Sequence, residues 1–281
     1  MNPGVWFFPD AEMAPIREKV WQVGDFAFCK EYTDKAALGR ELRLYDWLTD
    51  CGLPVISTYL TVDGLEWYAH GGRFYHLAKR LPGEHLRYPL SEPERFGRLY
   101  GETLRRVHDA LAKCPFADEF RENDLCDELD GWVTEALAGN DEFLQDVREV
   151  SAGLRSYAPA LPRQLIHRDP HGENLLFRGN ELTGVLDFEL CRTDYRLMDA
   201  AYLLSSVLDW EHWQEPSILN RFHRFTGAYL DAYRPTEAER EALLLMLRAV
   251  ALIFIPFWKD EKRRAQVIGL ARLFRDPKIL M

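Results

Sequence analysis

The chain has few cysteines, and their arrangement suggests neither a disulfide framework nor a metal centre. A disulfide-stapled fold needs an even, regularly spaced set, and a zinc site needs closely spaced Cys or His pairs. The five cysteines are instead odd in number and scattered along 281 residues: Cys29, Cys51, Cys114, Cys126 and Cys191. The sequence therefore predicts reduced thiols and a cytoplasmic protein.

Long apolar runs and an excess of basic charge are also lacking. The most hydrophobic segment, 242–258, is interrupted by Arg248 and Pro256 and is short for a membrane span, so we expect a buried helix. The N-terminus has no basic region before an apolar stretch, which argues against a secretory signal. The net charge of −10 argues against nucleic acid or an anionic membrane as partner and leaves cationic partners open.

What the sequence does contain is one dense group of polar residues, from His167 to Asp187, reading HRDPHGENLLFRGNELTGVLD. Its first half matches the H-R-D-x-x-x-x-N pattern of a kinase catalytic loop. Asp169 stands at the position of the base that orients the attacking hydroxyl, and Asn174 at that of a Mg²⁺ ligand. His167 is better interpreted as a structural group that fixes the loop by hydrogen bonding. For each residue alone, a turn or a local cap is the alternative.

A second carboxylate is expected to return to this loop. Apolar residues 175–177 and 185–186 flank the turn-forming residues 178–180, which predicts a β-hairpin. Such a hairpin brings Asp187 beside Asn174. Carboxylate and amide oxygens are the ligands that Mg²⁺ prefers, so the pair predicts a magnesium site that serves phosphoryl transfer from ATP or GTP.

The N-terminal part predicts a small sheet with one helix. Segments 18–23 and 25–32 resemble two strands, and the alternation in the second places Lys30 on a strand face. Residues 34–50 have a helical apolar period, and this helix carries Glu41. A strand lysine with a helix glutamate is the pair that kinases use to hold nucleotide phosphates. Two ordinary surface charges are the alternative.

Three further strands are predicted at 55–61, 66–70 and 73–79, and beyond Leu81-Pro82-Gly83 the pattern is helical apart from the hairpin. This predicts an α+β, two-lobed fold, with an antiparallel sheet and one helix in residues 1–81 and a larger, mainly helical lobe in 82–281. Backbone groups of the connector from Lys79 to Leu81 are expected to bind adenine.

On these residues, together with the later segment DYRLMDAAYLL, the chain resembles the aminoglycoside phosphotransferase and choline kinase family, the small-molecule branch of the protein-kinase-like fold. The resemblance implies Asp169 as base, Asn174 and Asp187 as Mg²⁺ ligands, Lys30 as phosphate ligand and Glu41 as its partner. It also implies that Asp199 anchors the catalytic loop. A helix N-cap is a second role open to Asp199.

The chain departs from the family pattern at three places. Arg168 stands where these kinases more often have glycine, and segment 10–17, where a phosphate-covering loop is expected, contains no glycine. Glu189 follows Asp187-Phe188 where protein kinases have glycine. It is a candidate for the metal shell or for substrate orientation, with a solvent-facing carboxylate as the alternative.

The expected activity is therefore transfer of the γ-phosphate to a hydroxyl of a small molecule. A protein serine/threonine kinase is the first alternative, although no A-P-E segment follows Asp187; a nucleotide-binding module without turnover is the second.

The resemblance implies that two acidic and aromatic regions line the acceptor pocket, which favours a cationic acceptor such as an aminoglycoside, a basic peptide antibiotic or an amino alcohol. A solvated acidic face is the alternative. The candidate residues are Asp127, Asp130, Asp209, Trp210, Glu211 and Trp213.

Overall fold

The computed structural model describes residues 3–208 and 215–280, and the chain divides into two compact units. The first consists of Met1–His85 and Asn174–Glu189, and the second of Leu86–Glu173 and Leu190–Met281. The lobe boundary expected after Leu81 lies close to the end of the first segment of unit 1. The predicted hairpin belongs to unit 1 as well.

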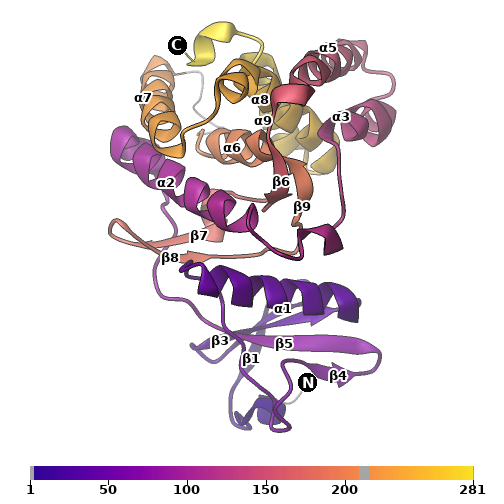
Figure 1. The fold of residues 1–281 in the computed structure, drawn as a ribbon, viewed down its shortest axis with the longest axis vertical. Helices are drawn as coiled ribbons and strands as arrows, with labels where there is room; N and C mark the ends of the chain where they lie inside the picture. The colour runs from indigo at the N-terminus through magenta and orange to yellow at the C-terminus, as the bar shows by residue number, and fades with distance from the viewer. Residues whose placement is uncertain (1–2, 209–214, 281) are drawn as a thin grey trace. The chain divides into compact units, whose positions relative to one another are not determined.

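Unit 1 contains a five-stranded antiparallel sheet with the order β1-β2-β3-β5-β4, as predicted for this part of the chain (Figure 1). The first three strands are consecutive antiparallel neighbours joined by short turns, and the last two are joined at Gly71-Gly72. The third and fifth strands pair with each other although residues 33–72 separate them in the chain. The strands are β1 Met13–Arg17, β2 Val20–Val23, β3 Ala27–Tyr32, β4 Tyr68–His70 and β5 Arg73–Lys79.

The structure differs from the predicted strands of this unit at two places. Segment 10–17, where a phosphate-covering loop was expected, instead forms strand β1 over residues 13–17. Strand β1 was missed because it is an exposed edge strand that contains Pro15, so it lacks the apolar alternation by which strands are recognised. Segment 55–61 is not a strand. It adds only two backbone hydrogen bonds at the end of β5, from Tyr59 N–H to the Leu77 carbonyl and from Lys79 N–H to the Ser57 carbonyl, each 2.8 Å long.

The two faces of the sheet bury different partners. Helix α1, Lys35–Asp50, covers one face and begins at Asp34, whose side chain accepts a hydrogen bond from the Ala36 N–H (Figure 1). On the other face a buried cluster forms from Trp6, Val23, Ala27, Cys29 and Leu77. Because side chains alternate along β3, Lys30 points to the face opposite Cys29, where α1 presents Glu41.

The predicted catalytic hairpin is confirmed. It consists of β7, Leu175–Arg178, and β8, Glu181–Val185. Just beyond its last pair, the Leu186 N–H donates to the Asn174 carbonyl at 2.9 Å, which brings Asp187 next to Asn174. The hairpin is tied to the rest of unit 1 by backbone hydrogen bonds from Val185 to Pro54 and between Glu84 and Phe177.

Unit 2 is mainly helical, as predicted. Its one two-stranded ladder, β6 Arg163–Ile166 with β9 Arg192–Tyr195, was missed because both strands are only four residues long and start with arginine. The helices are α2 Pro93–Leu111, α3 Leu125–Glu128, α4 Thr134–Ala136, α5 Asp141–Tyr157, α6 Arg196–Ser206, α7 Pro216–Tyr233, α8 Glu237–Phe257 and α9 Glu261–Leu273.

Close packing of α2 on α7 supports the centre of unit 2 (Figure 1). A β-carbon at Gly101 would lie 2.3 Å from the Tyr229 carbonyl oxygen, so only glycine permits this approach of the two backbones. The apolar segment predicted to form a buried helix lies within α8, and most of its apolar side chains are buried. Among residues 3–208 and 215–280, no helix combines the length and the apolar character needed to cross a membrane.

Candidate active site

The expected base, Asp169, lies in unit 2 on the loop that follows β6. The Tyr202 hydroxyl on α6 donates to Asp169 Oδ1 at 2.8 Å, and His171 Nε2 lies 3.5 Å from Oδ2. Burial alone would raise the pKa of Asp169, but the contacts with His171 and Tyr202 outweigh it and lower that pKa below its ordinary value. Asp169 is therefore an ionised carboxylate, and about a quarter of its side chain remains exposed.

The backbone of this loop is fixed by Asp199, in the first turn of α6. Its buried carboxylate accepts the N–H groups of His167 and Arg168, both at 2.8 Å. The His167 ring contributes a further bond, since its Nδ1 accepts the Asp169 N–H at 3.3 Å. These are the contacts through which His167 and Asp199 would fix the loop, and that role stays a prediction.

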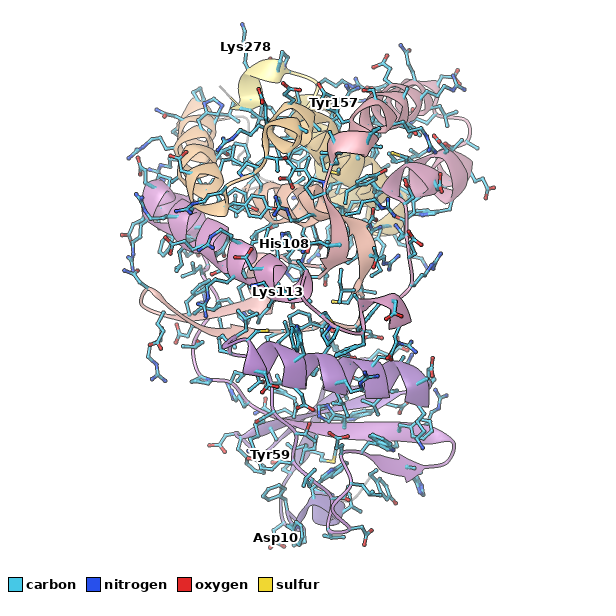
Figure 2. The ribbon with its side chains drawn as sticks, in the orientation of Figure 1. Asp10, Tyr59, His108, Lys113, Tyr157 and Lys278 are labelled. Atoms are coloured by element: carbon cyan, nitrogen blue, oxygen red, sulfur yellow. The ribbon has the colours of Figure 1, made fainter. Side chains whose placement is uncertain are left out.

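His108 is a member of this network that the sequence did not reveal. It lies on α2 (Figure 2), with Nε2 3.0 Å from Asp199 Oδ2 and Nδ1 3.1 Å from the Tyr233 hydroxyl. All three side chains are buried. A single histidine in an amphipathic helix carries no pattern that distinguishes it from other core residues, so only the fold identifies its contact with the loop anchor.

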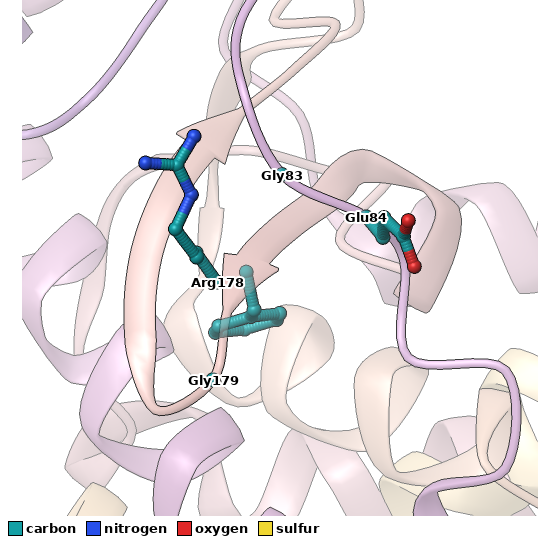
Figure 3. A pocket seen from close by; sticks show the side chains of 5 residues that line it. Gly83, Glu84, Arg178 and Gly179 are labelled. Atoms are coloured by element: carbon teal, nitrogen blue, oxygen red, sulfur yellow. The ribbon is translucent and has the colours of Figure 1, made fainter.

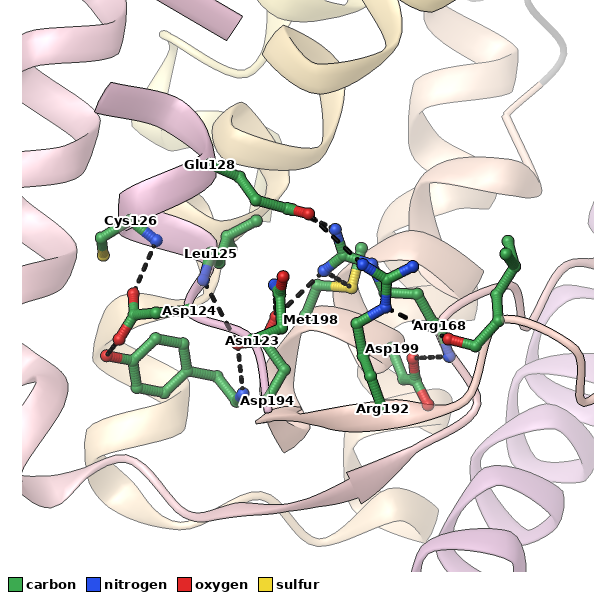
Figure 4. Close-up of polar contacts among 12 residues, drawn as sticks. Asn123, Asp124, Leu125, Cys126, Glu128, Arg168, Arg192, Asp194, Met198 and Asp199 are labelled. Atoms are coloured by element: carbon green, nitrogen blue, oxygen red, sulfur yellow. Dashed lines mark hydrogen bonds and ion pairs between the residues drawn. The ribbon is translucent and has the colours of Figure 1, made fainter. Parts of the chain in front are cut away.

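Arg168 adopts a left-handed backbone conformation, with φ of 75°. Glycine adopts this conformation without a steric penalty, which explains why glycine is common at this position in the resembled family. Here the arginine is retained by buried ion pairs: Nη1 lies 3.0 Å from Asp194 Oδ2, and Nη2 contacts Glu128 (Figure 4). Arg192 also contacts Glu128, at 3.4 Å. The catalytic loop is thus tied to α3 and β9.

In unit 1, Lys30 is surrounded by carboxylates. Its Nζ lies 2.8 Å from Glu189, 3.0 Å from Asp187 and 3.9 Å from the expected partner Glu41. Burial would lower the pKa of Lys30, but these carboxylates raise it overall. Glu41 is buried and accepts the Tyr45 hydroxyl at 2.8 Å, and burial raises its pKa. Lys30 is therefore within ion-pair distance of Glu41, and this is the longest of the three contacts that Lys30 makes with carboxylates.

Asp187, the second expected metal ligand, contacts two positively charged side chains. Lys30 contacts its Oδ1, and Arg17 Nη2 contacts its Oδ2 at 2.9 Å. Burial would raise the pKa of Asp187, but Lys30 and Arg17 outweigh that effect and keep it ionised. Asn174, buried beside it, adds an amide group.

Among the described residues no cluster of three or more Cys, His, Asp or Glu side chains is arranged to hold a metal. A pair of hard oxygen donors suits Mg²⁺, which takes few protein ligands and completes its shell with water and phosphate.

The connector residues differ in the backbone groups that they offer. The Lys79 N–H already donates to the Ser57 carbonyl. At Leu81, neither the N–H nor the carbonyl makes a backbone hydrogen bond within the described part of the chain. Of the two residues expected to bind adenine, Leu81 therefore has the available groups.

Next to the connector, unit 1 has a shallow hollow of about 370 Å³, lined by Gly83, Glu84, Phe177, Arg178 and Gly179 (Figure 3). Gly83 has a φ of 109°, and a β-carbon there would collide with the Thr183 side chain. None of the residues predicted for the active site lines this hollow.

The predicted acceptor residues are only partly described. Asp127 and Asp130 both contact Arg155 on α5 at 2.8 Å, so one positive charge within unit 2 already offsets part of their negative charge. Glu189 is more than half exposed and contacts Lys30. The other candidates lie outside the described residues: Asp209, Trp210, Glu211 and Trp213.

Residues 20–239 match the model of the phosphotransferase enzyme family. The chain belongs to this family. The phosphotransferase is 30% identical over 224 residues to a homoserine kinase of Zymomonas mobilis, an alignment that covers 76% of this chain and 67% of that one. The predicted family and the predicted small-molecule kinase activity are confirmed.

Solved structures confirm the kinase-like fold. The phosphotransferase resembles an amicoumacin kinase solved with AMP-PNP, Ca²⁺ and amicoumacin, with a TM-score of 0.73 and 14% identity over 95% of this chain and 88% of that one. It also resembles a choline/ethanolamine kinase family protein from Mesorhizobium loti, with a TM-score of 0.66 and 18% identity over 96% of this chain and 89% of that one. At these identities the likeness concerns the fold.

Proposed function

We propose that this phosphotransferase moves the γ-phosphoryl group of ATP or GTP, with Mg²⁺, to the hydroxyl of a small acceptor that carries an ammonium group. The observation that carries the proposal is Asp169, an ionised and partly exposed carboxylate on a loop whose backbone is anchored by Asp199. A carboxylate so held can orient a hydroxyl and take its proton as the phosphorus–oxygen bond forms.

Each remaining residue has a role that its contacts support. Asn174 and Asp187 would hold Mg²⁺, which neutralises phosphate charge when it is bound. Lys30 would contact the phosphates, and Glu41, already fixed by Tyr45, would help to orient it. Backbone groups of the connector would hold the base of the nucleotide.

For the acceptor we propose homoserine first. The curated relative named above is a homoserine kinase, and homoserine combines a primary hydroxyl with an ammonium group. Homoserine also carries a carboxylate and is zwitterionic, so the acidic net charge of the chain bears only on its ammonium group. The ion pairs of Asp127 and Asp130 with Arg155 weaken the case for a highly cationic antibiotic at those two residues, so antibiotic resistance is the second candidate.

A coupled assay of ADP release tests this directly. The purified full chain is given MgATP or MgGTP with L-homoserine, choline, ethanolamine, an aminoglycoside, a neutral sugar or casein. We expect turnover with homoserine and little with the neutral sugar. Turnover of the aminoglycoside alone would shift the function to resistance, and phosphorylation of casein would contradict the small-molecule assignment.

The site of action is proposed to be the cytoplasm. All five cysteines are free, and Cys29 is buried with its pKa raised by that burial to about 12, so it is an unreactive core thiol. A reducing compartment fits these thiols. Fractionation of the native host that recovers the activity outside the cytoplasm would contradict the location.

A further inference from the structure

The turn between β1 and β2 carries charge where a glycine-rich loop is expected. β1 ends at Arg17 and β2 begins at Val20, and Arg17 pairs with Val20 across the turn. Lys19, within the turn, has a left-handed φ of 61°. In kinases the glycines of the covering loop let backbone amides approach the phosphates closely. No glycine lies between Asp10 and Val20, a range that includes this turn, so that approach is hindered.

Arg17 sends its side chain from this turn to the predicted metal ligand. Its Nη2 donates to Asp187 Oδ2 at 2.9 Å, and this is its one hydrogen bond within residues 3–208 and 215–280. About 63% of the Arg17 side chain is exposed, so this ion pair leaves most of the side chain open to solvent. The other oxygen, Oδ1, is taken by Lys30. Both oxygens of Asp187 thus contact cations of the chain itself.

The charged side chains around Asp187 favour joint binding of a cation, Mg²⁺, and an anion, the nucleotide phosphates. Three carboxylates, those of Glu41, Asp187 and Glu189, surround Lys30, and Arg17 is the second positive side chain in contact with this group. When Asp187 coordinates Mg²⁺, its oxygens are no longer fully available to Arg17. The phosphate oxygens of a bound magnesium nucleotide would then offer Arg17 an anionic partner, and the planar guanidinium fork matches phosphate well.

We propose that Arg17 is a phosphate-binding residue of this phosphotransferase, whose side chain takes the task that backbone amides of a glycine-rich loop perform elsewhere. In the nucleotide-free protein the same guanidinium rests on Asp187, where it competes with Mg²⁺. The inference rests on the proposed function, because it assumes a magnesium nucleotide as co-substrate.

Two binding measurements test the proposal without relying on turnover. Mn²⁺ binding is measured in the absence of nucleotide by electron paramagnetic resonance, and binding of MgATP, MgADP and adenosine by calorimetry. The variants are Arg17→Ala and Arg17→Lys. Arg73→Ala serves as the matched control, because Arg73 is also an exposed arginine of this sheet with a single ion pair, to Glu31 at 3.5 Å.

Arg17→Ala should weaken MgATP binding about tenfold, the scale of one charge-assisted hydrogen bond, and leave adenosine binding unchanged. It should also tighten nucleotide-free Mn²⁺ binding several-fold, because Asp187 loses a competing cation. Arg17→Lys should fall between Arg17→Ala and wild type in both measurements, and Arg73→Ala should match wild type.

The outcomes separate the two proposals. If wild type binds MgATP and Arg17→Ala binds it equally well, Arg17 is not a phosphate ligand and the kinase proposal stands. An equal loss of adenosine and MgATP affinity would indicate damage to the fold and overturn the assignment, as would weaker Mn²⁺ binding in the variant. If wild type binds no nucleotide, both proposals fail.

Discussion

Replacing Arg168 by glycine has two opposite effects on the free energy of unfolding. Glycine removes the strain of a left-handed arginine, worth roughly 1–2 kcal/mol. It also deletes one partner of a buried ion pair and leaves Asp194, which is fully buried, without its cation. Breaking such a pair typically costs about 3–5 kcal/mol. Arg168→Gly should therefore lower the free energy of unfolding by roughly 1–4 kcal/mol.

The pH dependence of this loss has a definite sign. Burial already raises the pKa of Asp194, and Arg168 partly offsets that, so the variant should raise the pKa further. A carboxyl group whose pKa is higher in the folded than in the unfolded state binds more protons when folded, so stability falls as pH rises through that window. The difference between Arg168→Gly and wild type should therefore shrink as the pH is lowered from neutral.

Urea denaturation followed by circular dichroism measures both effects. Arg155→Ala is the control, because Arg155 also joins two carboxylates, Asp127 and Asp130, but on the surface. It should cost less than about 1 kcal/mol. If Arg168→Gly is as stable as wild type at neutral pH, or if its loss grows on acidification, the interpretation of the buried ion pair is refuted.

Three further substitutions test the site. Lys30→Ala should weaken MgATP binding about tenfold or more, while Glu41→Ala, which removes the longest contact of Lys30, should have a smaller effect in the same calorimetric titration. Equal effects would contradict this order. Tyr202→Phe removes a hydrogen bond to ionised Asp169, so the acid limb of kcat/KM should move to higher pH by about one unit in a pH–rate profile. A shift to lower pH would exclude that contact as the cause of the lowered pKa.

The sequence predicted elements with a strong local pattern and missed those that depend on distant partners. The hairpin after Asn174, the helix over 35–50 and strand β5 all have regular apolar spacing and clear turn residues. β1, β6 and β9 are short or exposed, and only their neighbours in the folded chain make them strands. Segment 55–61 has an apolar pattern, but only Thr58 pairs with β5, opposite Ala78, so no continuous ladder forms there.

Site residues within one local sequence pattern could also be predicted, whereas those that depend on distant partners could not. Asp169, Asn174 and Asp187 could be predicted because the catalytic loop and hairpin are contiguous in sequence. His108, Tyr202 and Arg17 could not, since each meets its carboxylate across a long stretch of chain: Asp199, Asp169 and Asp187 respectively. Nor does the sequence reveal that Lys30 lies closer to Asp187 and Glu189 than to Glu41.

The central claim is that Asp169 serves as the base for phosphoryl transfer to a small hydroxyl acceptor. Asp169→Asn keeps the size of the side chain and removes its charge, so kcat for homoserine-dependent ADP release should fall by at least about 10²-fold. MgATP affinity measured by calorimetry should stay near that of wild type, because Asp169 is not among the proposed nucleotide ligands. A variant that binds MgATP normally and retains full turnover would contradict the account.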